Sequence, residues 1–145
     1  MGFRKKTQRL SEQGQNLVEF ALMLPFLFVV LFGVLDLGRV FFASINLTNA
    51  VREGVRFLTL HPDDVVNDYS PYWGVKQAVF EEAGYSGISL SEGDVYVDCP
   101  NADGDDFCDS GTPATVEVTY DFDLILGWII PGPISVTRTA VMIVP

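Results

Sequence analysis

The stretch that decides the fold is LVEFALMLPFLFVVLFGVL, residues 17–35. It holds 19 residues with a single charge, that of Glu19, near its start. About 20 apolar residues in a helix are enough to cross the hydrocarbon core of a bilayer. The sequence therefore predicts a transmembrane segment, which we place over residues 15–36. Pro25 lies inside it and removes one helical hydrogen bond, which predicts a bend at that point.

Charge is distributed unevenly on the two sides of this segment. Four of the nine basic residues lie before Gly14, whereas 18 of the 19 acidic residues follow it. Because basic segments next to a membrane helix stay in the cytoplasm, we expect residues 1–14 inside the cell and the rest of the body outside. The net charge of −10 argues against nucleic acid as a partner, since phosphate neutralisation requires a basic surface.

Three interpretations of this end of the chain are open. A secretory signal removed after the apolar run is disfavoured, because its best cleavage site, Phe41-Phe42-Ala43, has a phenylalanine where a small residue is needed. The second interpretation is an uncleaved single-span anchor. The third is cleavage before the apolar run, on its cytoplasmic side, between Gly14 and Gln15.

The third interpretation depends on a combination of residues around Gly14. A basic leader ends in this glycine, Glu19 follows five residues later, and an apolar helix begins there. The full block reads Gly14-Gln15-Asn16-Leu17-Val18-Glu19-Phe20-Ala21, then Leu24-Pro25, then Gly33-Val34-Leu35-Asp36-Leu37-Gly38-Arg39. It resembles the prepilin leader of type IV pilin-like proteins and, more narrowly, the TadE-like family of small pseudopilins of the bacterial tight-adherence (Tad, or Flp) pilus.

This resemblance implies a processing step and an assembly role. A prepilin peptidase would cut after Gly14 and leave Gln15 as the N-terminus. Glu19, Phe20 and Pro25 would serve assembly, with Glu19 neutralising the new amine of its own or a neighbouring subunit, since low dielectric strengthens such a pair. The local alternative is that Glu19, in the first turn of its helix, interacts favourably with the helix dipole. The other implied partners are pilin subunits, the inner-membrane assembly platform and membrane lipid.

Beyond the membrane the helix is predicted to continue over residues 37–60 and to stop near His61-Pro62. Its apolar side chains share one arc of a helical wheel, which we expect the chain's own sheet to cover. That arc holds Leu37, Val40, Phe41, Ser44, Leu47, Val51, Val55 and Leu58. Phe42, Ile45 and Phe57 fall on the polar side, either as scattered surface residues or as contacts to other subunits or lipid.

Residues 61–145 predict a β-rich extracytoplasmic domain. Alternating and β-branched residues predict strands over 94–98, 114–122 and 134–144, and a short helix is predicted over 75–83. A small antiparallel sheet of three or four strands packed on the long helix gives an α+β, pilin-like fold.

An apolar segment, LILGWIIP at residues 124–131, separates the last two predicted strands. It is too short to span a bilayer. Burial in the core is the default interpretation. The alternatives are contact with the membrane surface, with Trp128 at the interface, or contact with a partner protein.

Cys99 and Cys108 are the chain's two cysteines, and a disulfide is the economical interpretation if they lie outside the cytoplasm. Acidic clusters around a glycine are typical of Ca²⁺ loops, but the EF-hand pattern fails here. A solvated acidic turn is therefore favoured over calcium, and no other cofactor is expected. The candidate calcium ligands would be Asn101, Asp103, Asp105 and Asp106.

Function follows from the N-terminal block rather than from a reactive site. The sequence has no Gly-rich phosphate loop and no nucleophile motif near its single histidine, His61, so we do not expect an enzyme. The resemblance to the TadE-like family implies a pilus assembly protein, a pseudopilin or minor pilin of the Tad pilus, in the bacterial cytoplasmic membrane or incorporated into a pilus. The alternative is an uncleaved, single-span, membrane-anchored extracytoplasmic binding module that holds calcium or another ligand.

Overall fold

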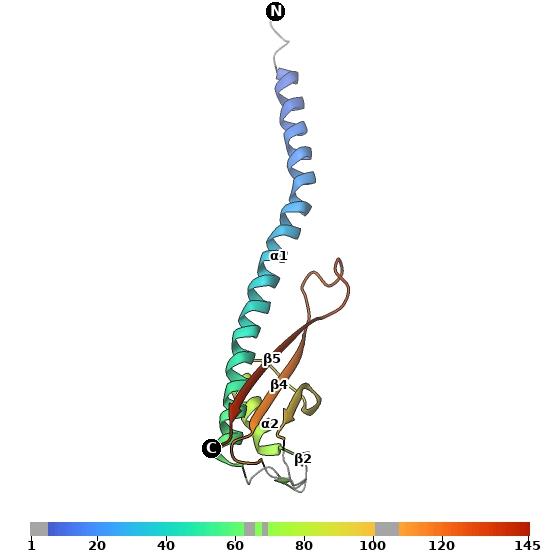
Figure 1. Cartoon of the computed structure of the whole chain (residues 1–145). Coiled ribbons are helices and arrows are strands. Elements are labelled where there is room, and N and C mark those ends of the chain that lie inside the picture. The colour runs from blue at the N-terminus through green and yellow to red at the C-terminus, as the bar shows by residue number, and fades with distance from the viewer. Residues whose placement is uncertain (1–5, 63–65, 68–69, 101–107) are drawn as a thin grey trace, which may run out of the picture.

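One helix runs through more than a third of the chain. The computed structural model describes residues 6–62, 66–67, 70–100 and 108–145, with side chains described for 14–62, 72–100 and 108–145. Helix α1, Lys6–Leu60, has 55 residues and continues through Pro25. Its N-terminal half projects alone, with a gentle curve, and its C-terminal half lies against the rest of the molecule (Figure 1). The other elements are β1 (Val66–Asn67), β2 (Ser70–Pro71), α2 (Trp73–Tyr85), the 3₁₀ helix η1 (Glu92–Asp94), β3 (Val95–Asp98), β4 (Pro113–Phe122) and β5 (Ile134–Ile143).

The last three strands form an antiparallel sheet in the order β3-β4-β5. β4 and β5 pair along their whole length, from Pro113 opposite Ile143 to Phe122 opposite Ile134, and β3 covers part of the other edge of β4. β1 and β2 pair separately as a two-residue antiparallel ladder. The predicted α+β fold, a long N-terminal helix packed on a small antiparallel sheet, is confirmed.

The core lies between the C-terminal half of α1, helix α2 and one face of the sheet. On β4 the residues Ala114, Val116 and Val118 are buried in alternation, because successive side chains of a strand point to opposite faces. Burial of each large aliphatic side chain contributes roughly 1.5–3 kcal/mol. The largest fully buried side chains are Leu47, Leu58, Val51, Val55, Val75, Val79, Val116, Val118 and Val144.

Gly54 lies where α1 packs tightly against α2. A Cβ atom at this position would lie 2.5 Å from Cγ2 of Val79 and 3.6 Å from Cγ1 of Val75. A valine in a helix has essentially one χ1 rotamer and does not rotate away easily. The glycine is therefore what allows the two helices to pack this closely.

The predicted covered arc of α1 was wrong at two positions. Leu37 and Phe41 are 72% and 68% exposed rather than covered by the sheet. The buried face of α1 is rotated toward Ala43 and Ala50, both almost fully buried. These small residues let the body approach the helix closely, and a count of large apolar side chains passes over them.

The three apolar residues predicted on the polar side of α1 have different environments. Phe42 and Ile45 are exposed. Phe57 packs partly against the core, and its ring stacks on that of His61 with 4.5 Å between centroids. Of these three residues, Phe42 and Ile45 are therefore the ones available to lipid or other subunits.

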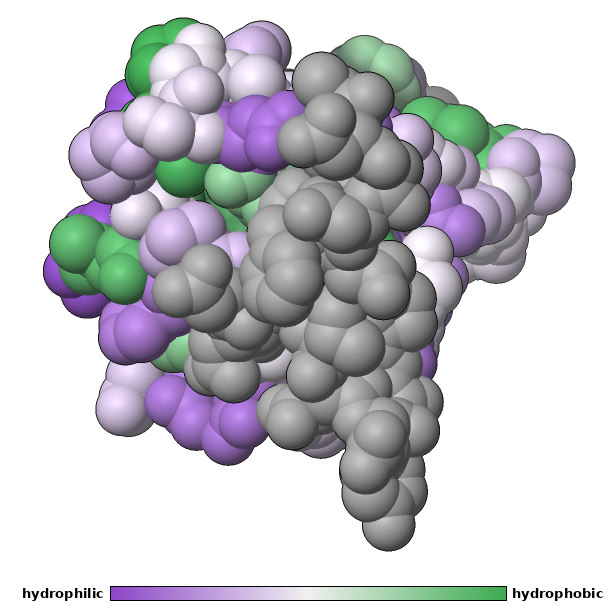
Figure 2. Space-filling model, turned by 60° about the horizontal axis from the view of Figure 1, so that its bottom comes forward, coloured by the Kyte–Doolittle hydropathy of each residue, from purple (hydrophilic) through white to green (hydrophobic). Residues whose placement is uncertain are grey.

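The end of the body farthest from the N-terminus has a different surface from the projecting helix. In the view of Figure 2, the described surface around this end is mainly hydrophilic, and its hydrophobic residues form small separate patches. Among the described residues, most of the exposed large hydrophobic side chains lie instead on α1.

Candidate functional site

The N-terminal half of α1 exposes a bilayer-length apolar surface, which we call the apolar stem (residues 17–35). Among the described residues, α1 is the one helix long and apolar enough to cross a membrane, and no other part of the chain buries its apolar window. At 1.5 Å per residue the stem is about 28 Å long, close to the ~30 Å of a hydrocarbon core. So large an exposed apolar surface requires lipid or other subunits to cover it.

The predicted processing residues, Gly14 and Gln15, lie inside α1, which begins at Lys6. The helix is continuous through Gly14, where an added Cβ would meet no atom within 4 Å. Gln15 and Glu19 are four residues apart, which places their side chains on the same helix face. Glu19 is exposed, and it makes no hydrogen bond or ion pair with any side chain in the described part of the chain.

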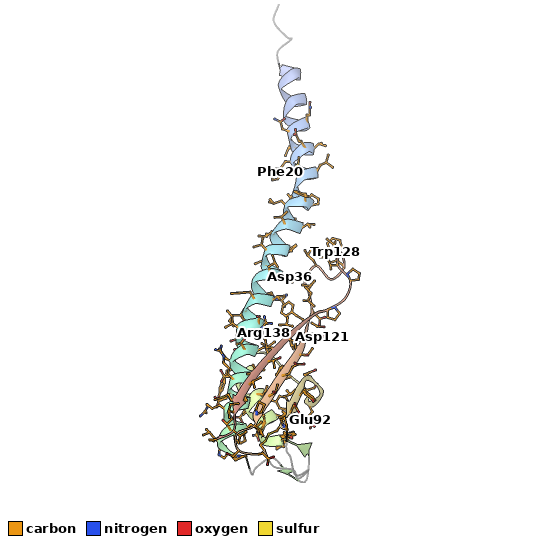
Figure 3. The ribbon with its side chains drawn as sticks, viewed as in Figure 1. Phe20, Asp36, Glu92, Asp121, Trp128 and Arg138 are labelled. Atoms are coloured by element: carbon orange, nitrogen blue, oxygen red, sulfur yellow. A yellow bond between two sulfur atoms is a disulfide. The ribbon has the colours of Figure 1, made fainter. Side chains whose placement is uncertain are left out.

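The other two predicted assembly residues also belong to the stem. Phe20 is exposed and projects from the helix where the sheet does not reach (Figure 3). Pro25 lies within the helix, which continues on both sides of it. The stem thus presents Glu19, Phe20 and Pro25 to whatever surrounds it.

Asp36, at the end of the stem, is a second functional position. Its side chain is buried, and its two carboxylate oxygens accept separate backbone hydrogen bonds, from the N–H of Ile125 at 3.0 Å and from the N–H of Leu126 at 3.1 Å. Arg39 Nη1 also donates to Asp36 Oδ1 at 3.2 Å. The segment that joins β4 to β5, which we call the β4–β5 loop (residues 123–133), is therefore fixed to α1 where the stem ends.

Two arginines extend this junction along the helix and the sheet. The guanidinium carbon of Arg39 lies 4.8 Å from the ring centroid of Phe122, a cation–π contact to the end of β4. Arg138 of β5 donates from Nε to Ser44 Oγ at 3.1 Å and from Nη2 to the same oxygen. Side chains from both long strands are therefore held against α1 by polar contacts as well as by the core.

Sequence reasoning did not assign a role to Asp36. The residue was part of the Gly33–Arg39 block that carries the family resemblance, but its partners lie 89 and 90 positions away in the chain. The available signal was a lone acid immediately after an apolar run, followed by Arg39 at helical spacing. That pattern predicts the Asp36–Arg39 pair. It does not predict the hydrogen bonds between Asp36 and the β4–β5 loop.

The predicted disulfide is present, and the predicted calcium group is not tested. Cys99 and Cys108 are bonded, with 5.5 Å between their Cα atoms. The candidate calcium ligands lie outside the described residues; they are Asn101, Asp103, Asp105 and Asp106. Within the residues that the structure describes, no three His, Cys, Asp or Glu side chains are grouped to hold a metal ion.

The fold and the stem define a class of protein: a single long helix with a bilayer-length apolar half, consistent with a single-pass membrane anchor, that carries a small antiparallel sheet. Residues 14–56 match the family model described as TadE-like protein, which confirms the predicted resemblance over this segment. Searches against curated proteins and against solved structures gave no match. The family match and the apolar helix together support a Tad pilus-related membrane protein.

Proposed function

We propose that this protein is a pseudopilin or minor pilin of the tight-adherence pilus, cleaved between Gly14 and Gln15 and assembled through its apolar stem. The observation that carries the proposal is the exposed stem, which lies within the segment that matches the TadE-like family. A helix surface of this length and apolarity can be covered by lipid before assembly and by the stems of other subunits afterwards. The role is structural and not catalytic.

Cleavage gives Glu19 a specific partner. The new α-amine at Gln15 would lie one helical turn from the Glu19 carboxylate, on the same helix face. At the edge of an apolar environment such a pair is strengthened, and an unpaired charge is penalised. Subunits whose amine meets a neighbour's Glu19 are therefore favoured over other alignments of the stems.

The expected topology places the N-terminus in the cytoplasm and the sheet outside. The basic residues before Gly14 favour this direction, and so does the Cys99–Cys108 disulfide, since disulfides persist in oxidising compartments. The partners would be the prepilin peptidase on the inner face, the inner-membrane assembly platform, and other pilin subunits. Membrane lipid surrounds the stem before assembly.

The proposal is tested by determining the N-terminal residue of the protein taken from the cells in which it works. Protein from the membrane fraction and from sheared pili of the native cells is sequenced from its N-terminus, and a start at Gln15 is expected in both. A strain without the prepilin peptidase is the control and should yield the full leader. A start at Met1 or Gly2 in normal cells would contradict the proposal and favour the uncleaved, membrane-anchored binding module, with calcium at residues 101–106 as its candidate ligand.

A further inference from the structure

We propose that the β4–β5 loop is a second membrane contact, which inserts Trp128, Ile129 and Ile130 into the outer interface of the bilayer that α1 crosses. The partner is the boundary between lipid headgroups and acyl chains. This inference goes beyond the pilin assignment, and it rests on only one part of it, the crossing of the membrane by α1.

The β4–β5 loop lies beside the last turns of the apolar stem. A Cβ at Gly33 would lie 3.8 Å from Cδ1 of Leu126, and an apolar groove of about 380 Å³ is lined by Val30 and Val34 of α1 together with Ile130 of the loop. Gly33 and Val30 precede Asp36 by three and six residues, or about 4.5 and 9 Å along the helix. The loop therefore reaches back beside the apolar stem, as the direction of the β4–β5 hairpin in Figure 1 shows.

The surface of the loop is uncharged and carries exposed apolar side chains. From Leu124 to Ile134 the chain carries no charged residue. Trp128 is 78% exposed near the tip (Figure 3), and Ile129 and Ile130 are also exposed. A tryptophan with apolar neighbours is typical of membrane–water interfaces, where its ring body contacts acyl chains and its N–H contacts headgroups or water.

Several backbone N–H groups of the loop have partners, which matters because unpaired N–H groups are costly away from water. Ile125 and Leu126 donate to Asp36. Gly127 donates to the carbonyl of Leu124, and Ile129 and Ile130 both donate to the carbonyl of Leu126. Pro131 and Pro133 have no N–H at all. These N–H groups are therefore paired within the protein, three of them inside the loop and two on Asp36, which lowers the cost of placing the loop beside an apolar medium.

The stem and the loop share a polar boundary, which favours lipid over a second copy of the chain as the partner. On α1, Asp36 is the first charged residue after Glu19. On the hairpin, the exposed Asp123 and the hydrogen bond from Ser135 Oγ to Asp121 Oδ1, 2.6 Å long, flank the apolar loop. Because Asp36 binds the loop directly, both segments change from apolar to polar at one depth. A planar bilayer requires the apolar parts of the stem and of the loop to end at the same depth, and a protein partner does not require this.

The two tryptophans of the chain provide the test. In the full-length protein reconstituted in phosphatidylcholine vesicles, Trp73→Phe leaves Trp128 as the only indole, and Trp128→Phe leaves Trp73. Trp73 begins α2, which packs on α1 at Gly54, about 27 Å beyond Asp36 at helical rise. With lipids brominated high on the acyl chain, Trp128 should lose most of its emission, and Trp73 should keep its emission.

Two controls separate the possible failures. Phe26→Trp in a chain without the native tryptophans reports the stem and should be quenched by lipids brominated deep in the acyl chain. If this indole is quenched but Trp128 is not, the loop proposal is overturned while the membrane anchor stands. A blue-shifted Trp128 that brominated lipid does not quench means that protein covers the loop, which also overturns the proposal. Circular dichroism checks the fold of each variant, and Trp73→Tyr replaces Trp73→Phe if that variant unfolds.

Discussion

Asp36 and Leu126 are 90 residues apart in the sequence and are joined by a 3.1 Å hydrogen bond from the backbone N–H of Leu126 to Asp36 Oδ2. Ile125 donates to the other carboxylate oxygen. This contact joins the end of the apolar stem to the connection between the two long strands. It therefore sets the position of the sheet along α1.

Replacement of Asp36 by Asn should loosen this junction. An amide offers one acceptor oxygen where the carboxylate offers two, so one of the N–H groups of Ile125 and Leu126 would face an amide NH₂. A buried donor without its acceptor costs about 1–3 kcal/mol, and both N–H groups should exchange faster in hydrogen-exchange measurements. Asp121→Asn is the matched control, because this exposed carboxylate binds only a neighbouring side chain of the same hairpin. Equal protection of the loop in Asp36→Asn and in the unchanged protein would refute the role of Asp36.

Gly14→Leu should block processing and leave the fold intact. An added side chain at Gly14 meets no atom within 4 Å, and leucine favours the helix more than glycine does. The mass of the membrane-bound product would then stay that of the full chain. Gly38→Leu, at another open position of α1, is the control and should be processed normally. Normal processing of Gly14→Leu would show that this glycine does not define the cleavage site.

Glu19→Ala should leave membrane insertion intact and impair assembly. Removal of a carboxylate at the edge of the stem lowers the cost of insertion, which reaches about 2.5–3.5 kcal/mol for a charge at the centre of a membrane helix. The new N-terminal amine would, however, lose its partner in the assembled stems. Membrane fractionation and the yield of sheared pili measure the two effects, and Glu19→Asp, which retains the charge, should assemble better than Glu19→Ala. A normal pilus yield from Glu19→Ala would show that Glu19 is not needed for assembly.

Gly54→Ala should destabilise the body by about 1–3 kcal/mol, as expected for overpacking of a close-packed core. The added methyl group would lie 2.5 Å from Cγ2 of Val79. Gly84→Ala in α2 is the control: its Cβ would meet no atom within 4 Å, so the change should be neutral or stabilise by about 0.4–1 kcal/mol through the unfolded chain. Thermal unfolding in detergent gives both values, and equal melting temperatures for the two variants would contradict the close approach of α1 and α2.

Reduction of the Cys99–Cys108 bond should lower the stability of the body by about 2–3 kcal/mol in the chain-entropy estimate for a short loop. The two cysteines are nine positions apart, and both are buried. Thermal unfolding with and without reductant measures the loss. The double variant Cys99→Ser, Cys108→Ser should be insensitive to reductant, and an unchanged melting temperature after both thiols have been titrated would exclude a stabilising role.

The parts of the fold that depend on one segment at a time were predictable from the sequence. The apolar run gave the stem, and alternation in residues 114–122 gave β4, because side-chain periodicity reports the environment of a single element. Which face of α1 is buried was harder to predict from the sequence. Ala43 and Ala50 are buried because other elements pack on them, and their own hydrophobicity is too small to indicate this. The loop contact of Asp36 was inaccessible, because it depends on a register set by the whole β4–β5 hairpin.

The continuity of α1 from Lys6 to Leu60 has a mechanical consequence. Because the helix continues through Pro25 without a break, a pull on the stem is transmitted to the turns that carry the sheet, and the sheet should follow when the stem is withdrawn from lipid. Extraction of a subunit would therefore move the helix and the sheet together, and Trp128 would leave the bilayer at the same time as the stem. The force that loads a subunit into a filament would also be the force that frees its body from the membrane.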